Sequence, residues 1–233
     1  MLHIKNKRNF SLFIFIIIEL VLTVLVQLFS GTFNTIVSFL AIVIAFLFPI
    51  LFIKNTSDYM YTQIGLFCTV FADLFLVVIK PTYQSVAMIF FSITQICYFL
   101  RIFINQENKK IKQLHLVTRL IATSLAIIIS IIILKDKTNF LSIISIFYYA
   151  NLIINIIFSF LTNKLRIFFP IGLILFACCD LLIGMSVLDE SYIKISDDSI
   201  LYFLVHPGFN LAWLFYIPSQ TLISISQLED NQL

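Results

Sequence analysis

Residues 10–30 read FSLFIFIIIELVLTVLVQLFS, with an unbroken apolar run over 13–18. A spanning α-helix needs about 20 mainly apolar residues. A strand can cross a bilayer only in a closed barrel, and the strands of such a barrel alternate polar and apolar residues. Because this stretch does not alternate, it predicts a membrane-spanning helix.

Seven further runs of the same kind follow it. We predict an all-α, polytopic membrane protein that forms a single membrane domain over 1–233. Lys5, Lys7 and Arg8 precede the first run, but its apolar core is too long for a signal peptide and no small-residue cleavage pattern follows. The eight predicted spans are 10–30, 33–53, 59–79, 82–104, 115–134, 139–161, 167–188 and 201–226.

The composition excludes other classes of protein. The 233 residues are 61% hydrophobic and 12% charged, whereas a soluble domain is roughly 45–50% apolar and about 25% charged. A soluble enzyme would lack the polar surface it needs, and a disordered chain would need low hydrophobicity. The net charge of +3 is too small and scattered for a nucleic-acid binder.

The distribution of Lys and Arg predicts the orientation, because short cytoplasmic loops carry an excess of these residues. We therefore expect both termini in the cytoplasm. Nine basic residues lie on the N-terminal side, namely Lys5, Lys7, Arg8, Lys54, Lys109, Lys110, Lys112, Lys164 and Arg166. Four lie on the opposite side, namely Lys80, Lys135, Lys137 and Lys194.

A short internal repeat links two of the spans. Ile64-Gly65-Leu66 with Asp73-Leu74 recurs as Ile171-Gly172-Leu173 with Asp180-Leu181, so the second copy lies 107 residues after the first. The third and seventh spans would cross the bilayer in the same direction. The repeat therefore suggests two parallel four-helix halves related by an axis near the membrane normal.

Asp73 and Asp180 are the main candidates for catalysis. An ionisable residue inside a membrane is costly and is a functional-site hypothesis by default. Both lie about 14 residues into their spans, roughly 20 Å deep at ~1.5 Å per residue. Two buried carboxyl groups can share one proton, one acting as an acid and the other as a base. The alternative is that each Asp only accepts hydrogen bonds from neighbouring helices.

Other polar side chains occur at helical spacing. Glu19, Thr23 and Gln27 share one face of the first span, where they line the same cavity or bond a partner helix. In the last span, His206, Asn210, Trp213, Tyr216 and Gln220 share an arc. The fourth span carries Ser92, Gln95, Tyr98 and Arg101, and the sixth carries Tyr148, Tyr149, Asn151 and Asn155. Converging from four helices, these residues predict a polar cavity.

No metal site or organic cofactor is expected. The three histidines are scattered, and Cys68, Cys97, Cys178 and Cys179 lie inside apolar runs as small buried side chains. The chain lacks a Gly-rich phosphate loop, a Gly-x-Ser-x-Gly elbow and a His-Glu-x-x-His pair.

With acids in the third and seventh of eight spans, the chain resembles the YhhN-like family of membrane lysoplasmalogenases, which are alkenyl-ether hydrolases. That family typically has Gly-Asp, His-x-x-Tyr, Ser-Asp and a Tyr segment that ends in Gln-x-Leu-Ile. The similar residues here are Ala72-Asp73, Gln95 with Tyr98, Cys179-Asp180 and 215–223. A sixth-span tyrosine of the family corresponds to Tyr148 or Tyr149. Ala72, Gln95 and Cys179 depart from the pattern.

The resemblance implies cleavage of a lysoplasmalogen, with Asp73 and Asp180 as the acid–base pair. The partners would be this lysophospholipid and membrane lipid, without nucleic acid. Two alternatives are a proton-coupled small-molecule or lipid transporter and a non-catalytic lipid-binding protein. The candidate substrate-binding residues are Gln95, Tyr98, Tyr148, Asn151, Asn155, His206, Tyr216 and Gln220.

Overall fold

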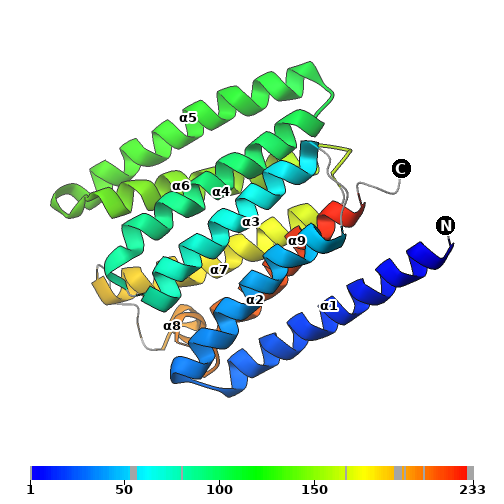
Figure 1. Ribbon diagram of the computed structural model, residues 1–233. Helices are drawn as coiled ribbons and strands as arrows, with labels where there is room; N and C mark the ends of the chain where they lie inside the picture. Colours follow the sequence, from blue (N-terminus) through cyan, green and yellow to red (C-terminus); the bar gives the residue numbers. More distant parts are fainter. Residues whose placement is uncertain are drawn as a thin grey trace.

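The fold is a bundle of long helices, shown in Figure 1. The computed structural model describes residues 2–52, 57–79, 81–165, 167–191, 196, 198–206 and 208–229, and no strand occurs among them. Lys54, Lys80, Arg166 and Lys194, which contribute to the predicted orientation, lie outside the described residues. The long helices are α1 (Leu2–Leu28), α2 (Gly31–Phe52), α3 (Ser57–Asp73), α4 (Gln84–Asn105), α5 (Lys109–Leu134), α6 (Phe140–Phe160), α7 (Phe168–Ser191) and α9 (Leu211–Glu229).

Four short elements complete the described part of the chain. A π-helical segment, η1 (Leu74–Ile79), continues α3, and the single turn η2 (Pro81–Tyr83) precedes α4. The turn η3 (Lys135–Lys137) follows α5, and the short helix α8 (Ile200–Val205) lies between α7 and α9. The helical class predicted from the sequence is thereby confirmed.

Seven of the helices in the described part are long and apolar enough to cross a membrane, and they correspond to the first seven predicted spans. The predicted eighth span, 201–226, is instead divided into α8 and α9. The described residues His206 and Gly208 to Asn210 lie outside both helices, and glycine is unfavourable inside a helix. The polar side chains of α9 face inward. Its buried polar residues are Ser219, Gln220, Thr221, Ser224, Ser226 and Gln227.

Helix α9 is the central helix of the bundle, because it packs against α7, α2, α1 and α3. A buried arginine on α4 fixes one end of it. The Arg101 guanidinium donates to the Ser226 hydroxyl at 2.7 Å and to the Ser226 carbonyl at 3.3 Å, and it stacks over the Phe169 ring of α7. A helix with polar side chains is therefore accommodated where other helices shield it from lipid.

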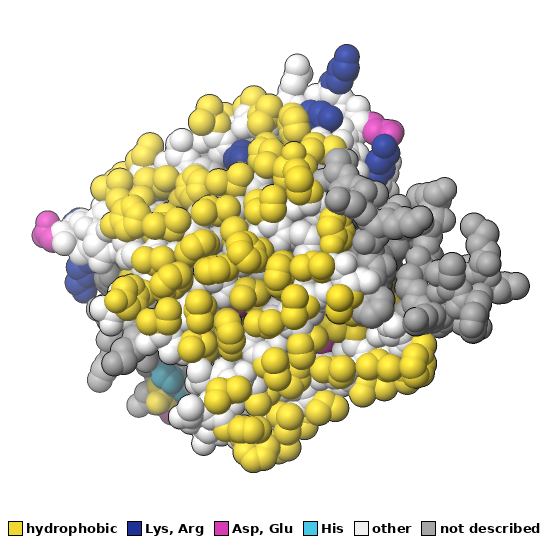
Figure 2. Space-filling view, viewed as in Figure 1, with side chains coloured by type: hydrophobic (Ala, Val, Ile, Leu, Met, Phe, Trp, Pro, Cys, Tyr) yellow, Lys and Arg dark blue, Asp and Glu magenta, His cyan; other side chains and the backbone are white. Residues whose placement is uncertain are grey.

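The outer surface is apolar, as expected where helices face hydrocarbon chains. Figure 2 shows hydrophobic side chains over the middle of one face and charged side chains near its ends. The outermost helix is α5, whose membrane-spanning window is only 6% buried. Together with the seven apolar helices, this surface identifies an integral membrane protein.

The packing order agrees with two parallel halves. In the first half α1 packs on α2, α2 on α3 and α3 on α4. The second half repeats this order with α5, α6, α7 and α9. Between the halves, α4 packs on α6 and α9 packs on α2, as a two-fold relation would require.

Each repeat glycine lies at the contact between the third and fourth helix of its half. A Cβ atom on Gly65 would lie 2.6 Å from Cε1 of Tyr98. On Gly172 it would lie 2.8 Å from Cγ1 of Ile223 and 3.1 Å from the Ser219 carbonyl oxygen. The glycines therefore allow a close helix–helix approach, and the Gly65 carbonyl also accepts a hydrogen bond from Thr94 on α4 at 3.1 Å.

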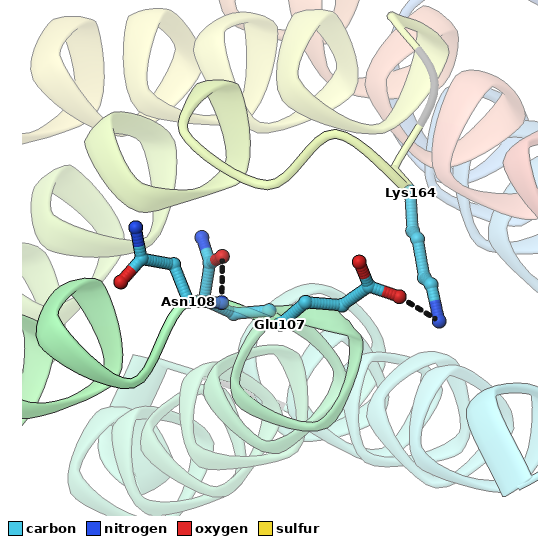
Figure 3. A network of polar contacts seen from close by, with 4 residues as sticks. Glu107, Asn108 and Lys164 are labelled. Carbon is cyan, nitrogen blue, oxygen red and sulfur yellow. Dashed lines mark hydrogen bonds and ion pairs between the residues drawn. The ribbon is translucent and has the colours of Figure 1, made fainter.

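Two loops meet at one end of the bundle (Figure 3). Lys164 forms an ion pair with Glu107 at 2.9 Å, and this hydrogen bond lowers the pKa of Glu107. Both side chains are exposed, so the pair adds little stability. The buried amide of Gln106 holds the loops more firmly, because it donates to the Leu161 carbonyl at 2.7 Å and to the Thr162 hydroxyl at 3.2 Å.

The repeat glycines yield a stability prediction. Gly65→Ala and Gly172→Ala should each lower the free energy of unfolding by about 1–3 kcal/mol, because the new methyl group overpacks a buried contact. Unfolding of the purified protein in mixed micelles would measure the change. The control is Gly184→Ala on α7, where a Cβ atom would meet nothing within 4 Å. Equal losses in all three variants would contradict the close-contact interpretation.

Candidate active site

Asp73 lies at the point where α3 changes to the π-helical segment η1. Such π-helical segments frequently occur at functional sites. The side chain of Asp73 is 2% exposed, and its Oδ2 accepts a hydrogen bond of 2.6 Å from the Tyr216 hydroxyl of α9. The central helix therefore provides the partner that a buried carboxyl group needs.

Asp180 occupies the equivalent position in the second half, on α7. It is half-buried, and its Oδ2 accepts a hydrogen bond from the Tyr148 hydroxyl of α6. The sequence left Tyr148 and Tyr149 as alternatives at this position. In the structure Tyr148 bonds the acid and is itself buried.

An aromatic cluster joins the two Asp–Tyr pairs. The Phe176 ring of α7 has its centroid 5.4 Å from that of Tyr216 and 6.2 Å from that of Tyr148. Phe91 of α4 packs against both Phe176 and Tyr148. The two Asp–Tyr pairs are therefore linked through aromatic rings, in an apolar setting. Among the described residues, neither carboxyl group forms an ion pair with Lys or Arg.

A second polar network lies beside this cluster and holds three of the predicted substrate-binding residues. Arg119 of α5 donates to the Oδ1 atoms of Asn151 and Asn155 on α6, the latter at 2.6 Å. The Asn155 amide in turn donates to the Gln95 side-chain oxygen on α4 at 3.0 Å and to the Gln95 carbonyl at 2.9 Å. These bonds tie α4, α5 and α6 together.

Arg119 was missed as a site residue by the sequence analysis, although a cation inside an apolar run is itself a signal. It also contacts Nε2 of His115 at 3.0 Å and stacks over the Phe99 ring. His115 stacks in turn on Phe158, with ring centroids 4.0 Å apart. The aromatic rings explain how α5 keeps a guanidinium group against the bundle.

Three further predicted substrate-binding residues, all in the described part of the chain, form no hydrogen bond with either acid. Tyr98 is fully buried at the Gly65 contact and packs edge-on against Phe169. Gln220 is fully buried, and its amide donates to the Ser219 hydroxyl at 3.4 Å. His206 follows α8, with its ring 4.6 Å from that of Tyr202.

The three polar residues on one face of α1, Glu19, Thr23 and Gln27, make different contacts. The Gln27 amide donates to the Asn210 carbonyl at 3.0 Å, and its oxygen accepts from the Asn210 backbone N–H at 2.8 Å. Gln27 therefore bonds a partner segment. Glu19 is 3% exposed, and among the described residues its carboxyl oxygens have no hydrogen-bond partner. Thr23 donates back to the Glu19 carbonyl of its own helix at 2.7 Å.

The comparison with protein families gives a match. The family model described as the YhhN family matches residues 11–226, which is nearly the whole chain. No curated protein and no solved structure matches the chain. In the described part of the chain, no group of three or more His, Cys, Asp or Glu side chains could hold a metal ion.

The two Asp–Tyr bonds yield the second prediction. Tyr216→Phe and Tyr148→Phe should each lower the free energy of unfolding by about 1–3 kcal/mol, because a buried or half-buried carboxyl group loses its donor while the ring packing remains. Unfolding in mixed micelles again measures the loss. Tyr83→Phe serves as the control, since Tyr83 is 48% exposed. The prediction would be wrong if both buried variants were as stable as this control.

Proposed function

The chain belongs to the YhhN family, and we propose that it is a membrane hydrolase that cleaves the vinyl-ether bond of a lysoplasmalogen. The products would be a fatty aldehyde and a glycerophospho head group. The observation that supports this function best is the pair of membrane-embedded acids on α3 and α7, each with its own tyrosine donor, with the two tyrosines packed on the same Phe176 ring.

The chemistry needs one proton donor and one carboxylate. Two carboxyl groups that interact across an apolar setting titrate as a pair and resist carrying two negative charges, so one proton is shared between them. We assign this shared proton to Asp73 and Asp180. Each tyrosine hydroxyl donates to its carboxyl group, and this bond holds the carboxyl in a fixed orientation.

The reaction then follows from general acid–base catalysis. The protonated Asp delivers its proton to the vinyl carbon that does not bear oxygen, and an oxocarbenium ion forms. The ionised Asp stabilises this cation and removes a proton from the water molecule that adds to it. The resulting hemiacetal breaks its bond to the glycerol oxygen, which gives the aldehyde and the free hydroxyl. One water molecule is consumed in total.

This reaction resembles that of glycosidases, which also use two carboxyl groups and an oxocarbenium-like transition state. The scheme requires no metal or organic cofactor. A lysolipid has one chain, which can remain in the lipid beside the apolar outer helices while the ether bond reaches the acids. On this proposal both termini face the cytoplasm, as the excess of Lys and Arg on their side predicts.

The direct test is aldehyde release from a 1-alkenyl lysophospholipid by the purified protein in detergent. Asp73→Asn and Asp180→Asn should each reduce the rate by about 10²–10⁴-fold, the usual contribution of a positioned acid or base. The control is Asp136→Asn, which changes an exposed acid in η3 and should keep the full rate.

Normal aldehyde release by both variants would rule out the acid–base assignment. Transport offers a separate outcome, because a carrier would move its substrate into proteoliposomes in response to a pH gradient without releasing aldehyde. The folded state of each variant is checked by its unfolding transition, so that a loss of rate is not confused with a loss of structure.

A further inference from the structure

An open hollow of about 770 Å³ lies beside α8. Figure 1 shows α8 at the end of the bundle away from the start of α1 and the end of α9. The wall of the hollow includes the turn between α1 and α2, the last turns of α7 and the connection from α8 to α9. Its volume is within the roughly 300–1,000 Å³ range of small-molecule sites. Because the ends of membrane-spanning helices lie at the level of the lipid head groups, the hollow is placed where it could meet a head group.

The described lining combines apolar side chains with a smaller set of polar, uncharged ones. No Asp, Glu, Lys or Arg is among the described residues that line it. Its side chains offer hydroxyl, amide and imidazole groups, which can donate hydrogen bonds to an oxyanion. The polar lining residues are Gln27, Ser30, Asn34, Ser186, His206 and Asn210.

Part of the wall is held in place before any ligand binds. Gln27 forms two hydrogen bonds with the backbone of Asn210, at 3.0 and 2.8 Å, and so joins α1 to the start of α9. The Asn34 amide donates to the Val26 and Phe29 carbonyls at 2.6 and 2.9 Å, which closes the turn between α1 and α2. A preformed wall reduces the ordering cost of binding.

The hollow is adjacent to both candidate acids along the chain. Ile183 lines it and lies one helical turn after Asp180 on α7. Ala212 lines it and lies one turn before Tyr216, which bonds Asp73. A ligand in the hollow is therefore about one turn, ~5.4 Å, from the level of the site.

We infer that this hollow binds the phosphate-bearing head group of a single-chain lysolipid, with His206 and Ser186 among its hydrogen-bond donors. The inference rests on the proposed function, whose substrate it specifies. The glycerol unit would then extend from the hollow toward Asp180, and this brings the ether bond to that acid. The hydrocarbon chain would leave the bundle toward the lipid.

The test measures binding without turnover. Trp213 is the only tryptophan of the chain; it follows Ala212 and packs on Tyr216, with ring centroids 5.3 Å apart. Its fluorescence should therefore report on occupancy of the hollow. The ligand is a 1-O-alkyl lysophospholipid, whose saturated ether lacks the double bond that is protonated during hydrolysis. We expect saturable binding to the purified protein in detergent.

Two comparison ligands identify the chemistry. A 1-O-alkylglycerol without phosphate should bind at least about tenfold more weakly, since it loses the hydrogen bonds of the head group. Glycerophosphate without a chain should also bind at least about tenfold more weakly, because it loses the apolar contribution. Equal binding of the alkylglycerol would overturn the head-group assignment, and equal binding of glycerophosphate would overturn the lipid assignment.

Variants locate the site. Ser186→Leu fills the hollow and His206→Gln changes one donor, and each should weaken lysophospholipid binding by about tenfold, which one hydrogen bond can account for. Gly184→Leu on the same helix does not line the hollow and should bind as the unmodified chain does. Unchanged binding in both hollow variants would overturn the inference.

The outcome is independent of catalysis. Asp180→Asn should retain lysophospholipid binding even where aldehyde release is lost, because Asp180 does not line the hollow. If the protein released no aldehyde but still bound the saturated ether in the hollow, the proposed hydrolysis would fail while the head-group site would stand. If aldehyde were released but both hollow variants bound the lysophospholipid as the unmodified chain does, the head-group site would fail while the proposed hydrolysis would stand.

Discussion

The absence of water in the hydrocarbon core constrains the whole structure, because a polar side chain that faces lipid there is costly. Helix α9 meets this constraint by lying at the centre, where its Ser, Thr and Gln side chains are covered by four other helices. The bond from Tyr216 to Asp73 joins this central helix to α3. The position of the candidate site therefore follows from how the bundle shields its most polar helix.

Much of the fold could be predicted from the sequence, because runs of about 20 apolar residues have few other interpretations. The division of 201–226 into α8 and α9 was missed, since apolar content does not show where one helix ends and the next begins. The acids were found because a carboxyl group in an apolar run is unusual. The hydrogen-bond partners of the acids were harder to predict from the sequence. Asn151 is one turn from Tyr148, yet it bonds Arg119 while Tyr148 bonds Asp180. Helical spacing shows which residues share a face, but it does not show which neighbour that face meets.

The repeat accounts for the equal depth of the acids, and the rest of the fold makes them different. Asp73 receives its hydrogen bond from α9, the fourth helix of the opposite half, whereas Asp180 receives its bond from α6, the second helix of its own half. A strict two-fold relation would have given equivalent donors. The tyrosines thus break the symmetry that the two glycine contacts preserve.

This asymmetry suits chemistry that needs an acid and a base at once, because two carboxyl groups take different roles only when their environments differ. Asp73 is 2% exposed and has its donor on the central helix, while Asp180 is half-buried and lies one turn from the hollow. A ligand that entered from the hollow would reach Asp180 first and Asp73 only through the aromatic cluster around Phe176. The pair of acids is in this way an ordered pair, with one member toward the hollow and the other in the interior.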